Sequence, residues 1–211
     1  MKRGAYIELV RRQIYGSFPP EEAEITVNLV NTWLNQAVGY AAQKCYSNNL
    51  RLEGVAFVNG GFYTTFKGLA ITKDENFLWK VELPEIPPGI GYNEGISTVV
   101  FKSDLGEISY PVVLMNQNQT SISKGMRPIP NKLVGHQEGK NVYVLSTVNL
   151  TQYTATATII SGGVSTDLNS ELNVPPDYLV EVTEYLKQQL AFERAQPQDV
   201  NPDGIDGGKT T

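Results

Sequence analysis

The spacing of apolar residues changes twice along this chain, and that change constrains the fold more than any other feature. In residues 1–50, apolar side chains recur every three or four positions, which is the spacing of an amphipathic helix. In residues 51–165, they alternate with polar side chains, as in strands that bury one face. The helical spacing returns in residues 166–195. Because nothing helical lies between the expected strands, the pattern predicts an α+β protein whose sheet is mostly antiparallel.

Two helices are predicted in the N-terminal part. The first is short and ends at Gly16, just before Pro19–Pro20. The second is predicted to stop at Ser47–Asn48–Asn49, which makes it about 39 Å long. Its expected first turn holds the carboxylates Glu21, Glu22 and Glu24. We interpret them as favourable charge at a helix start rather than as paired acids for catalysis.

A third helix is predicted near the C-terminus. It starts at Pro175–Pro176–Asp177, and Leu179, Val182, Leu186 and Leu190 lie along one face. We expect this segment, residues 166–195, to pack with the N-terminal helices and complete the helical part. Residues 196–211, rich in Gly, Pro and Asp, are predicted to form a flexible arm that becomes ordered only in an assembly.

About seven strands are predicted in residues 51–165, arranged as a sandwich or a barrel. They are expected at Gly54–Val58, Phe62–Phe66, Phe77–Leu83, Ser97–Lys102, Glu107–Leu114, Asn141–Ser146 and Tyr153–Ser161. Asn59–Gly60–Gly61 is predicted to be a hairpin turn between the first two. The long connections 84–95 and 116–131 are predicted to be functional or interacting loops, because long loops without structure of their own are uncommon in compact domains.

Charge and residue content exclude several classes of function. Seventeen basic and 22 acidic residues give a net charge of −5, which argues against a nucleic-acid-binding domain. One His and one Cys exclude a Cys/His zinc cluster and an internal disulfide. We expect His136 to be an ordinary surface or capping residue and Cys45 to be a buried small hydrophobe. The sequence therefore predicts no catalytic residue, no metal ligand and no cofactor site.

Two motifs resemble ligand-binding loops but lack essential parts. Gly89, Gly91 and Gly95 approach a dinucleotide fingerprint, yet the third glycine falls one residue late and prolines precede the motif in place of a strand. Asp199 and Asp203 match the first half of a calcium loop, but its twelfth position is Thr rather than Glu. We interpret the first as a turn-rich loop and the second as a solvated tail.

The N-terminal segment carries charge where a signal peptide would be apolar. Arg3, Arg11 and Arg12 form a small basic end, which we expect to be solvated or to dock onto an acidic partner. No stretch approaches the roughly 18 to 20 apolar residues of a membrane-spanning helix. The sequence predicts a chain made in a cytoplasm, with no membrane partner.

Several stretches together resemble a family of virion proteins. They are Val10–Gly16 with Phe18–Pro19, Glu53–Asn59 with Phe62–Leu69, Pro84–Pro87 with Gly89–Gly91, Met126–Lys132, Ile160–Gly163 before Asn173–Pro175, and Glu193–Arg194 before Pro197–Val200. The set resembles the ring proteins that crAss-like bacteriophages stack between portal and tail, and it covers nearly the whole chain. None of these stretches carries chemistry.

The resemblance implies a structural subunit of the head-to-tail connector, or neck, and not an enzyme. It implies a closed homo-oligomeric ring, twelve-fold to match a portal, around a channel through which genomic DNA passes without specific binding. The partners would be further copies of the chain, the portal and other ring or tail proteins. The location would be the virion, after synthesis in the cytoplasm of the host bacterium. A closed ring requires heterologous contacts between neighbouring subunits.

An alternative function is that of a binding module within a virion. In this hypothesis the β-domain recognises a glycan or a partner protein through exposed aromatic side chains, for which Tyr63, Trp79 and Tyr92 are the candidates. Self-association separates the two hypotheses, because a binding module could be monomeric whereas a ring needs a fixed, high subunit number.

Overall fold

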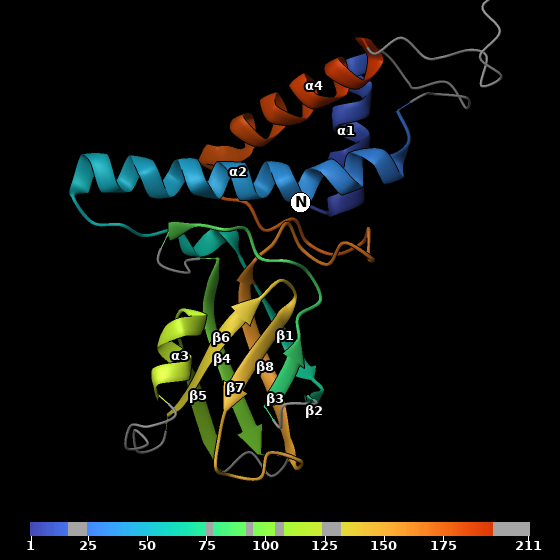
Figure 1. Ribbon diagram of the computed structural model, residues 1–211. Coiled ribbons are helices and arrows are strands. Elements are labelled where there is room, and N and C mark those ends of the chain that lie inside the picture. Colours follow the sequence, from blue (N-terminus) through green and yellow to red (C-terminus); the bar gives the residue numbers. More distant parts are fainter. Residues whose placement is uncertain (17–24, 75–77, 92–94, 104–107, 124–131, 196–211) are drawn as a thin grey trace, which may run out of the picture.

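The fold is α+β, as predicted, with a layer of helices above a barrel-like sheet (Figure 1). The computed structural model describes residues 1–16, 25–74, 78–91, 95–103, 108–123 and 132–195. The helical layer consists of α1 (Arg3–Tyr15), α2 (Val27–Glu53) and α4 (Leu179–Ala195). The predicted arm, residues 196–211, lies outside the described residues. None of the helices in the described part of the chain combines the length and the apolar character needed to cross a bilayer.

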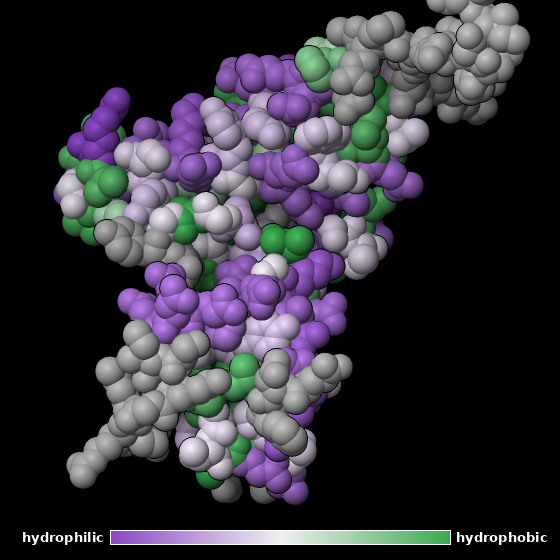
Figure 2. Space-filling view, in the orientation of Figure 1, coloured by the Kyte–Doolittle hydropathy of each residue, from purple (hydrophilic) through white to green (hydrophobic). Residues whose placement is uncertain are grey.

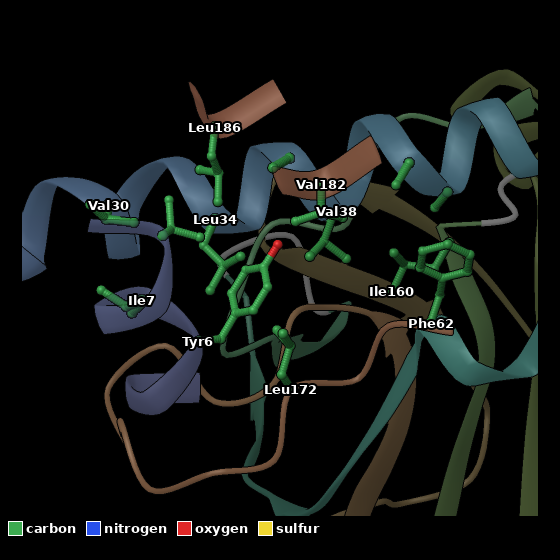
Figure 3. Packing of buried hydrophobic residues seen from close by; sticks show 14 of the residues in the cluster. Tyr6, Ile7, Val30, Leu34, Val38, Phe62, Ile160, Leu172, Val182 and Leu186 are labelled. Carbon is green, nitrogen blue, oxygen red and sulfur yellow. The ribbon is translucent and has the colours of Figure 1, made fainter. Parts of the chain in front are cut away.

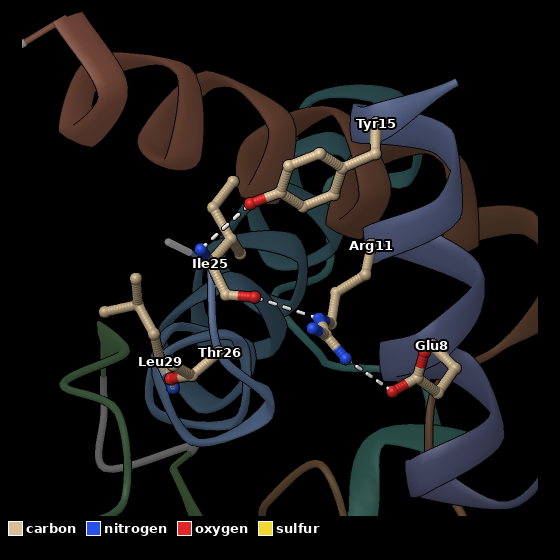
Figure 4. A network of polar contacts seen from close by, with 6 residues as sticks. All are labelled: Glu8, Arg11, Tyr15, Ile25, Thr26 and Leu29. Atoms are coloured by element: carbon tan, nitrogen blue, oxygen red, sulfur yellow. Dashed lines mark hydrogen bonds and ion pairs between the residues drawn. The ribbon is translucent and has the colours of Figure 1, made fainter. Parts of the chain in front are cut away.

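A polar network holds the end of α1 against the start of α2 (Figure 4). Arg11 donates from Nε to the Ile25 carbonyl oxygen at 2.9 Å and forms an ion pair with Glu8 at 2.7 Å. The Ile25 N–H donates to the Tyr15 hydroxyl at 3.0 Å. Thr26 then caps α2 by accepting from a backbone N–H in the first turn. The direction of α2 is therefore set by side chains of α1.

Both predicted limits of α2 are wrong. The helix begins at Val27, so its first turn is not acidic, and Glu21, Glu22 and Glu24 lie outside the described residues. It also continues past the asparagines to Glu53, and Gly54 ends it in the left-handed conformation (φ 68°). The asparagines do not stop the helix because tertiary contacts use them: the Asn49 amide donates to the Phe57 carbonyl oxygen at 3.0 Å.

The helices share one hydrophobic core, to which α2 contributes most (Figure 3). Its buried members include Tyr6, Ile7, Val30, Leu34, Val38, Phe62, Ile160, Leu172, Val182 and Leu186. The Tyr6 hydroxyl is hydrogen-bonded to the hydroxyl of Thr183 at 2.8 Å, which joins α1 to α4. Burial raises the pKa of Tyr6, and the bond to Thr183 opposes this effect. The apolar stripes predicted for the three helices therefore meet in this core.

The sheet is an eight-stranded, nearly closed barrel. Its strands are β1 (Tyr63–Leu69), β2 (Ile71–Lys73), β3 (Trp79–Glu82), β4 (Ile96–Ser103), β5 (Ser109–Leu114), β6 (Leu133–Glu138), β7 (Asn141–Leu145) and β8 (Tyr153–Ile160). The order is β1-β8-β4-β5-β6-β7-β3-β2, and all neighbours are antiparallel except β5 and β6. Since the edge strands β1 and β2 follow each other in the chain, the bend at Ala70 places the end of β1 next to the start of β2.

A second hydrophobic core fills the barrel. Its buried members include Trp79, Val81, Val99, Phe101, Val142, Val144, Leu150, Ala155, Ala157 and Ile159. In β8, Ala155, Ala157 and Ile159 point inward, whereas Thr154 is exposed, which confirms the predicted alternation. The molecule thus has two cores, one for each layer.

Some local predictions in the β-rich part are wrong. Residues Gly54–Val58 do not form a strand, and Asn59 caps the 3-10 turn η1 (Gly60–Phe62) instead of a hairpin. Phe62 is fully buried in the helical core, so this stretch connects the two layers and cannot pair within the sheet. The predicted loop 116–131 contains the helix α3 (Gln117–Ser123), which connects the parallel strands β5 and β6. Strands β2 and β6 were not predicted.

Candidate functional site

The junction between the two layers is built around a fully buried arginine. Arg3, 0% exposed, donates from Nε to the Asn31 side chain at 2.6 Å and from Nη2 to the Asn35 side chain at 2.9 Å. It also donates from Nη1 to the Gly162 carbonyl oxygen at 2.8 Å and from Nη2 to that of Asn31 at 3.1 Å. Arg3 thereby ties the start of α1 to α2 and to the chain that leaves the barrel after β8.

Glu85 provides the opposite charge at this junction. Its carboxylate accepts from the Ser161 hydroxyl at 2.7 Å and from the Ser165 N–H at 2.9 Å. Burial lowers the pKa of Arg3, and the Glu85 charge acts in the opposite direction. A buried guanidinium remains protonated, so Arg3 acts at this junction through its charge and its four hydrogen bonds. The junction is suited to positioning the layers.

The expectation that Arg3 and Arg11 form a solvated basic end is wrong. Arg3 is enclosed by the junction, and the Arg11 side chain is only 12% exposed and bonded to Glu8 and to Ile25. Arg12, the third member, forms an interaction of its own. Arginine near a chain start is ordinarily solvated, and no local pattern distinguishes a position that tertiary structure encloses. The role of Glu85 was missed for the same reason.

A groove of 730 Å³ lies beside the junction, between α2 and the loop that follows β3. One face of α2 forms its first wall, with Thr32, Asn35, Gln36, Gly39, Tyr40 and Gln43. The opposite wall is Pro84–Ile90, and Lys140 of the β6–β7 hairpin and Tyr185 of α4 also line the groove. The loop 84–95, predicted to be functional or interacting, thus supplies a wall through its described part.

The exposed apolar side chains are distributed unevenly between the two layers. Among the described residues, the large hydrophobic side chains exposed within helices are Leu9, Tyr40, Leu50, Leu52, Val180 and Phe192, whereas no strand exposes one. Just after α2, Val55 and Phe57 are also exposed, at 59% and 39%. In Figure 2, hydrophobic side chains gather at the far end of the helical layer from α1, bordered by hydrophilic ones. Such exposed sets mark interaction surfaces in soluble proteins.

Cys45 is buried on the apolar stripe of α2, as predicted. Its thiol is hydrogen-bonded to the Tyr178 hydroxyl. This bond and, to a smaller extent, burial raise the pKa of Tyr178 to about 12. The Asn49 amide lies 3.5 Å from the Cys45 sulfur. The thiol is therefore part of the packing between α2 and the start of α4.

His136 is not the surface residue that was expected. It lies on β6, is 7% exposed, and stacks on Tyr143 with the two ring centroids 5.4 Å apart. Its Nδ1 has no hydrogen-bond partner among the described residues. No group of three or more His, Cys, Asp or Glu side chains in the described ranges could hold a metal ion. Among the described residues, His136 has no oriented partner of the kind that a general base requires.

The aromatic platform of the binding-module hypothesis is not assembled. Trp79 is 4% exposed and points into the barrel core, while the Lys73 ammonium covers its ring at 4.7 Å. Tyr63 is half-buried, and Tyr92 lies outside the described residues. A stacking surface for a sugar needs an exposed ring face, which Trp79 lacks.

The glycine-rich loop has a structural explanation. A Cβ at Gly95 would overlap the Pro88 carbonyl oxygen, and one at Gly91 would lie 3.1 Å from the Tyr46 hydroxyl. These glycines allow the loop to fold tightly against α2 and against itself. Asp199 and Asp203, of the partial calcium motif, lie outside the described residues. Comparison with known proteins adds no assignment, since the chain matches no protein-family model and no curated protein.

Proposed function

We propose that this protein is a structural subunit of a bacteriophage virion, one that assembles into a ring of the head-to-tail connector between portal and tail. The observation that carries the proposal is the uneven exposure of apolar side chains: the described helices expose six large ones, and the described strands expose none. An enclosed barrel needs no partner to complete its core, whereas a helical layer of this kind gains stability when a second subunit covers it.

The α2 tip, defined as Leu50, Leu52, Val55 and Phe57, would provide one contact surface. Leu52 is 75% exposed at the end of a long helix, where nothing of its own chain covers it within the described residues. The exposed Leu9 and Phe192 belong to the other two helices, α1 and α4. Two distinct surfaces on one subunit are what a heterologous, ring-closing contact requires.

The acidic character of the chain supports a channel through which DNA passes. A net charge of −5 repels phosphates, so a channel wall built from such subunits would not retain the duplex. The junction of Arg3 and Glu85 would keep the two layers of each subunit in a fixed relation within the stack. Tight, salt-sensitive retention of duplex DNA by isolated rings would contradict this part of the proposal.

Native mass spectrometry of the assembled protein tests the ring directly. Leu50→Lys places a charge on the α2 tip, and Ile108→Lys is the matched control, because both side chains are 48% exposed and Ile108 precedes a barrel strand. A cation near the end of α2 is compatible with its helix dipole, so folding is preserved. We expect wild type and Ile108→Lys to form one large, fixed oligomer and Leu50→Lys to remain unassembled. A single-subunit mass for the wild type, or an equal effect of both variants, would contradict the proposal.

A further inference from the structure

The groove between α2 and residues 84–90 presents hydrogen-bonding groups that the described chain leaves unused. Gln36 and Gln43 are exposed on the α2 wall, and their amides bond to no other described residue. Thr32, by contrast, donates its hydroxyl to the Asn28 carbonyl oxygen at 2.9 Å. A glutamine amide offers both donors and an acceptor, which matches the N–H and C=O groups of an extended polypeptide. The groove is thus equipped to bind main chain.

The same groove exposes two apolar side chains on opposite walls. Tyr40 of α2 is 48% exposed and stacks on Tyr185 at 5.0 Å, and Ile86 of the loop is 64% exposed. In Figure 2, a small hydrophobic area lies at the boundary between the helical layer and the barrel, with hydrophilic side chains around it. A fitting ligand would therefore be a mostly polar, extended chain with a few small apolar side chains.

We propose that this groove binds residues 196–211 of a neighbouring copy of the chain. The large apolar side chains of this segment are Val200 and Ile205, and its other residues are polar, Gly or Pro. In an extended chain these two side chains would be about 17 Å apart. Thr32 and Gln43, at the two ends of the groove wall, are eleven positions apart on α2, which is also about 17 Å. The distance between the two apolar side chains of the segment is thus similar to the length of this wall.

Charge favours the same occupant. Residues 196–211 contain three aspartates and one lysine, so the segment is acidic. Lys140 is exposed where it lines the groove. The groove carboxylate, Glu85, is buried and directed at Ser161 and Ser165, with Arg3 as its countercharge. The exposed charge within the groove is thus positive and complements the segment.

The course of α4 indicates that the segment comes from another copy. The C-terminal end of α4 lies beside α1, on the side of the helical layer away from the barrel, whereas the groove lies between α2 and the barrel (Figure 1). Sixteen residues, 196–211, follow α4, and a fully extended chain of this length would span about 53 Å. An extended segment of this length would reach an adjacent subunit without turning back across its own helices. This inference rests on the proposed ring, in which every subunit has such a neighbour.

A disulfide cross-link between separately labelled copies tests the assignment. In a full-length Cys45→Ser background, one population carries Gln36→Cys in the groove and a second carries Ile205→Cys. The matched control is Gln188→Cys, which replaces another exposed helical glutamine outside the groove. After co-assembly and mild oxidation, we expect at least about a tenfold higher yield of the mixed dimer for Gln36→Cys than for Gln188→Cys, the difference that geometric proximity gives over chance encounter.

Equal yields of the mixed dimer for Gln36→Cys and for Gln188→Cys would overturn the inference. A photo-cross-linking amino acid at Ile205, in a chain that keeps Cys45, provides a second measurement if the cysteine variants do not fold. It is expected to label peptides of α2 or of residues 84–90 in an isotopically distinct copy, and labelling of the same copy alone would also overturn the inference. Native mass spectrometry of the same samples separates the two proposals. Intact rings without the cross-link contradict the groove assignment alone, and lone subunits contradict the proposed function.

Discussion

The helical layer and the barrel solve the same problem, burial of apolar surface, to different degrees. The barrel brings both edges of its sheet together through the consecutive strands β1 and β2, and no described strand exposes a large hydrophobic side chain. The helical layer buries one face of each helix and leaves others uncovered, such as Leu52 at 75% and Phe192 at 63%. A nearly closed sheet encloses its apolar face, whereas a helix always retains an outer face that needs either polar residues or a partner.

This difference suggests a division of roles within one subunit. The barrel is complete in itself, and the helical layer carries the surfaces through which subunits would meet. The junction around Arg3 and Glu85 connects the two cores with polar contacts in addition to apolar packing. Substitutions in one layer, or in the junction between the layers, test this division of roles.

The largest effect is expected from Arg3→Met, which removes the four hydrogen bonds of Arg3 and leaves the Gly162 carbonyl oxygen without this partner. A hydrogen bond to a charged group contributes about 1.5–3 kcal/mol, so the loss of several should cost about 3–5 kcal/mol. Urea unfolding of the variant measures this cost, with Arg51→Met as the control, because Arg51 is exposed on α2. The control should stay within about 0.5 kcal/mol of the wild type. Equal stability of the two variants would show that the junction does not hold the layers together.

Matched leucines in the two cores test whether the layers unfold as one unit. Leu34 of the helical core and Leu150 of the barrel core are both fully buried, so each change to Ala should cost about 2–5 kcal/mol. Tryptophan fluorescence can follow the unfolding of each layer separately, since Trp33 lies on α2 and Trp79 in β3. Single-tryptophan variants should show one common transition for both substitutions. Two separate transitions would mean that each layer unfolds by itself.

Glycines in the two regions should tolerate a methyl group differently. At Gly135 in β6, a Cβ would press on the Tyr143 carbonyl oxygen, a backbone atom that cannot move away, and overpacking of this kind costs about 1–3 kcal/mol. At Gly39 in α2, a Cβ would lie 3.1 Å from the Pro88 ring. The better helix propensity of Ala offsets that contact, so the net change should stay below about 1 kcal/mol. Thermal unfolding of both variants shows which substitution destabilises the protein more. A larger loss of stability for Gly39→Ala than for Gly135→Ala would contradict this prediction.

The smallest effect concerns alkaline pH and the helical layer alone. The pKa of Tyr178 is about 12 in the folded protein, above its ordinary value, because of its bond to Cys45 and its burial. A raised folded pKa contributes stability that is complete below about pH 10 and is lost as the pH rises toward about 12. Tyr178→Phe should therefore reduce the loss of stability across this window, as measured by urea unfolding at each pH. An unchanged slope would show that this phenol does not titrate with folding.

Much of the helical layer could be predicted from local pattern. The stripe Val182, Leu186 and Leu190 identified the buried face of α4, and Gly16 identified the end of α1. The limits of α2 could not be predicted in this way, because asparagines that favour turns are held inside the helix by contacts with residues distant from their own turn. In the barrel, the alternation in β8 was predictable, whereas the short strand β2 contains too few residues to show a period.

The sequence by itself determined the class of fold, because the period of apolar residues records which face of each element must be buried. The tertiary structure alone decided where the charges belong: Arg3, Glu85 and His136 look like ordinary surface residues until the two layers enclose them. Burial of a polar group depends on partners far away in the chain, such as Gly162 for Arg3. Local spacing carries no record of those partners, so the junction and the groove beside it emerge only when the layers meet.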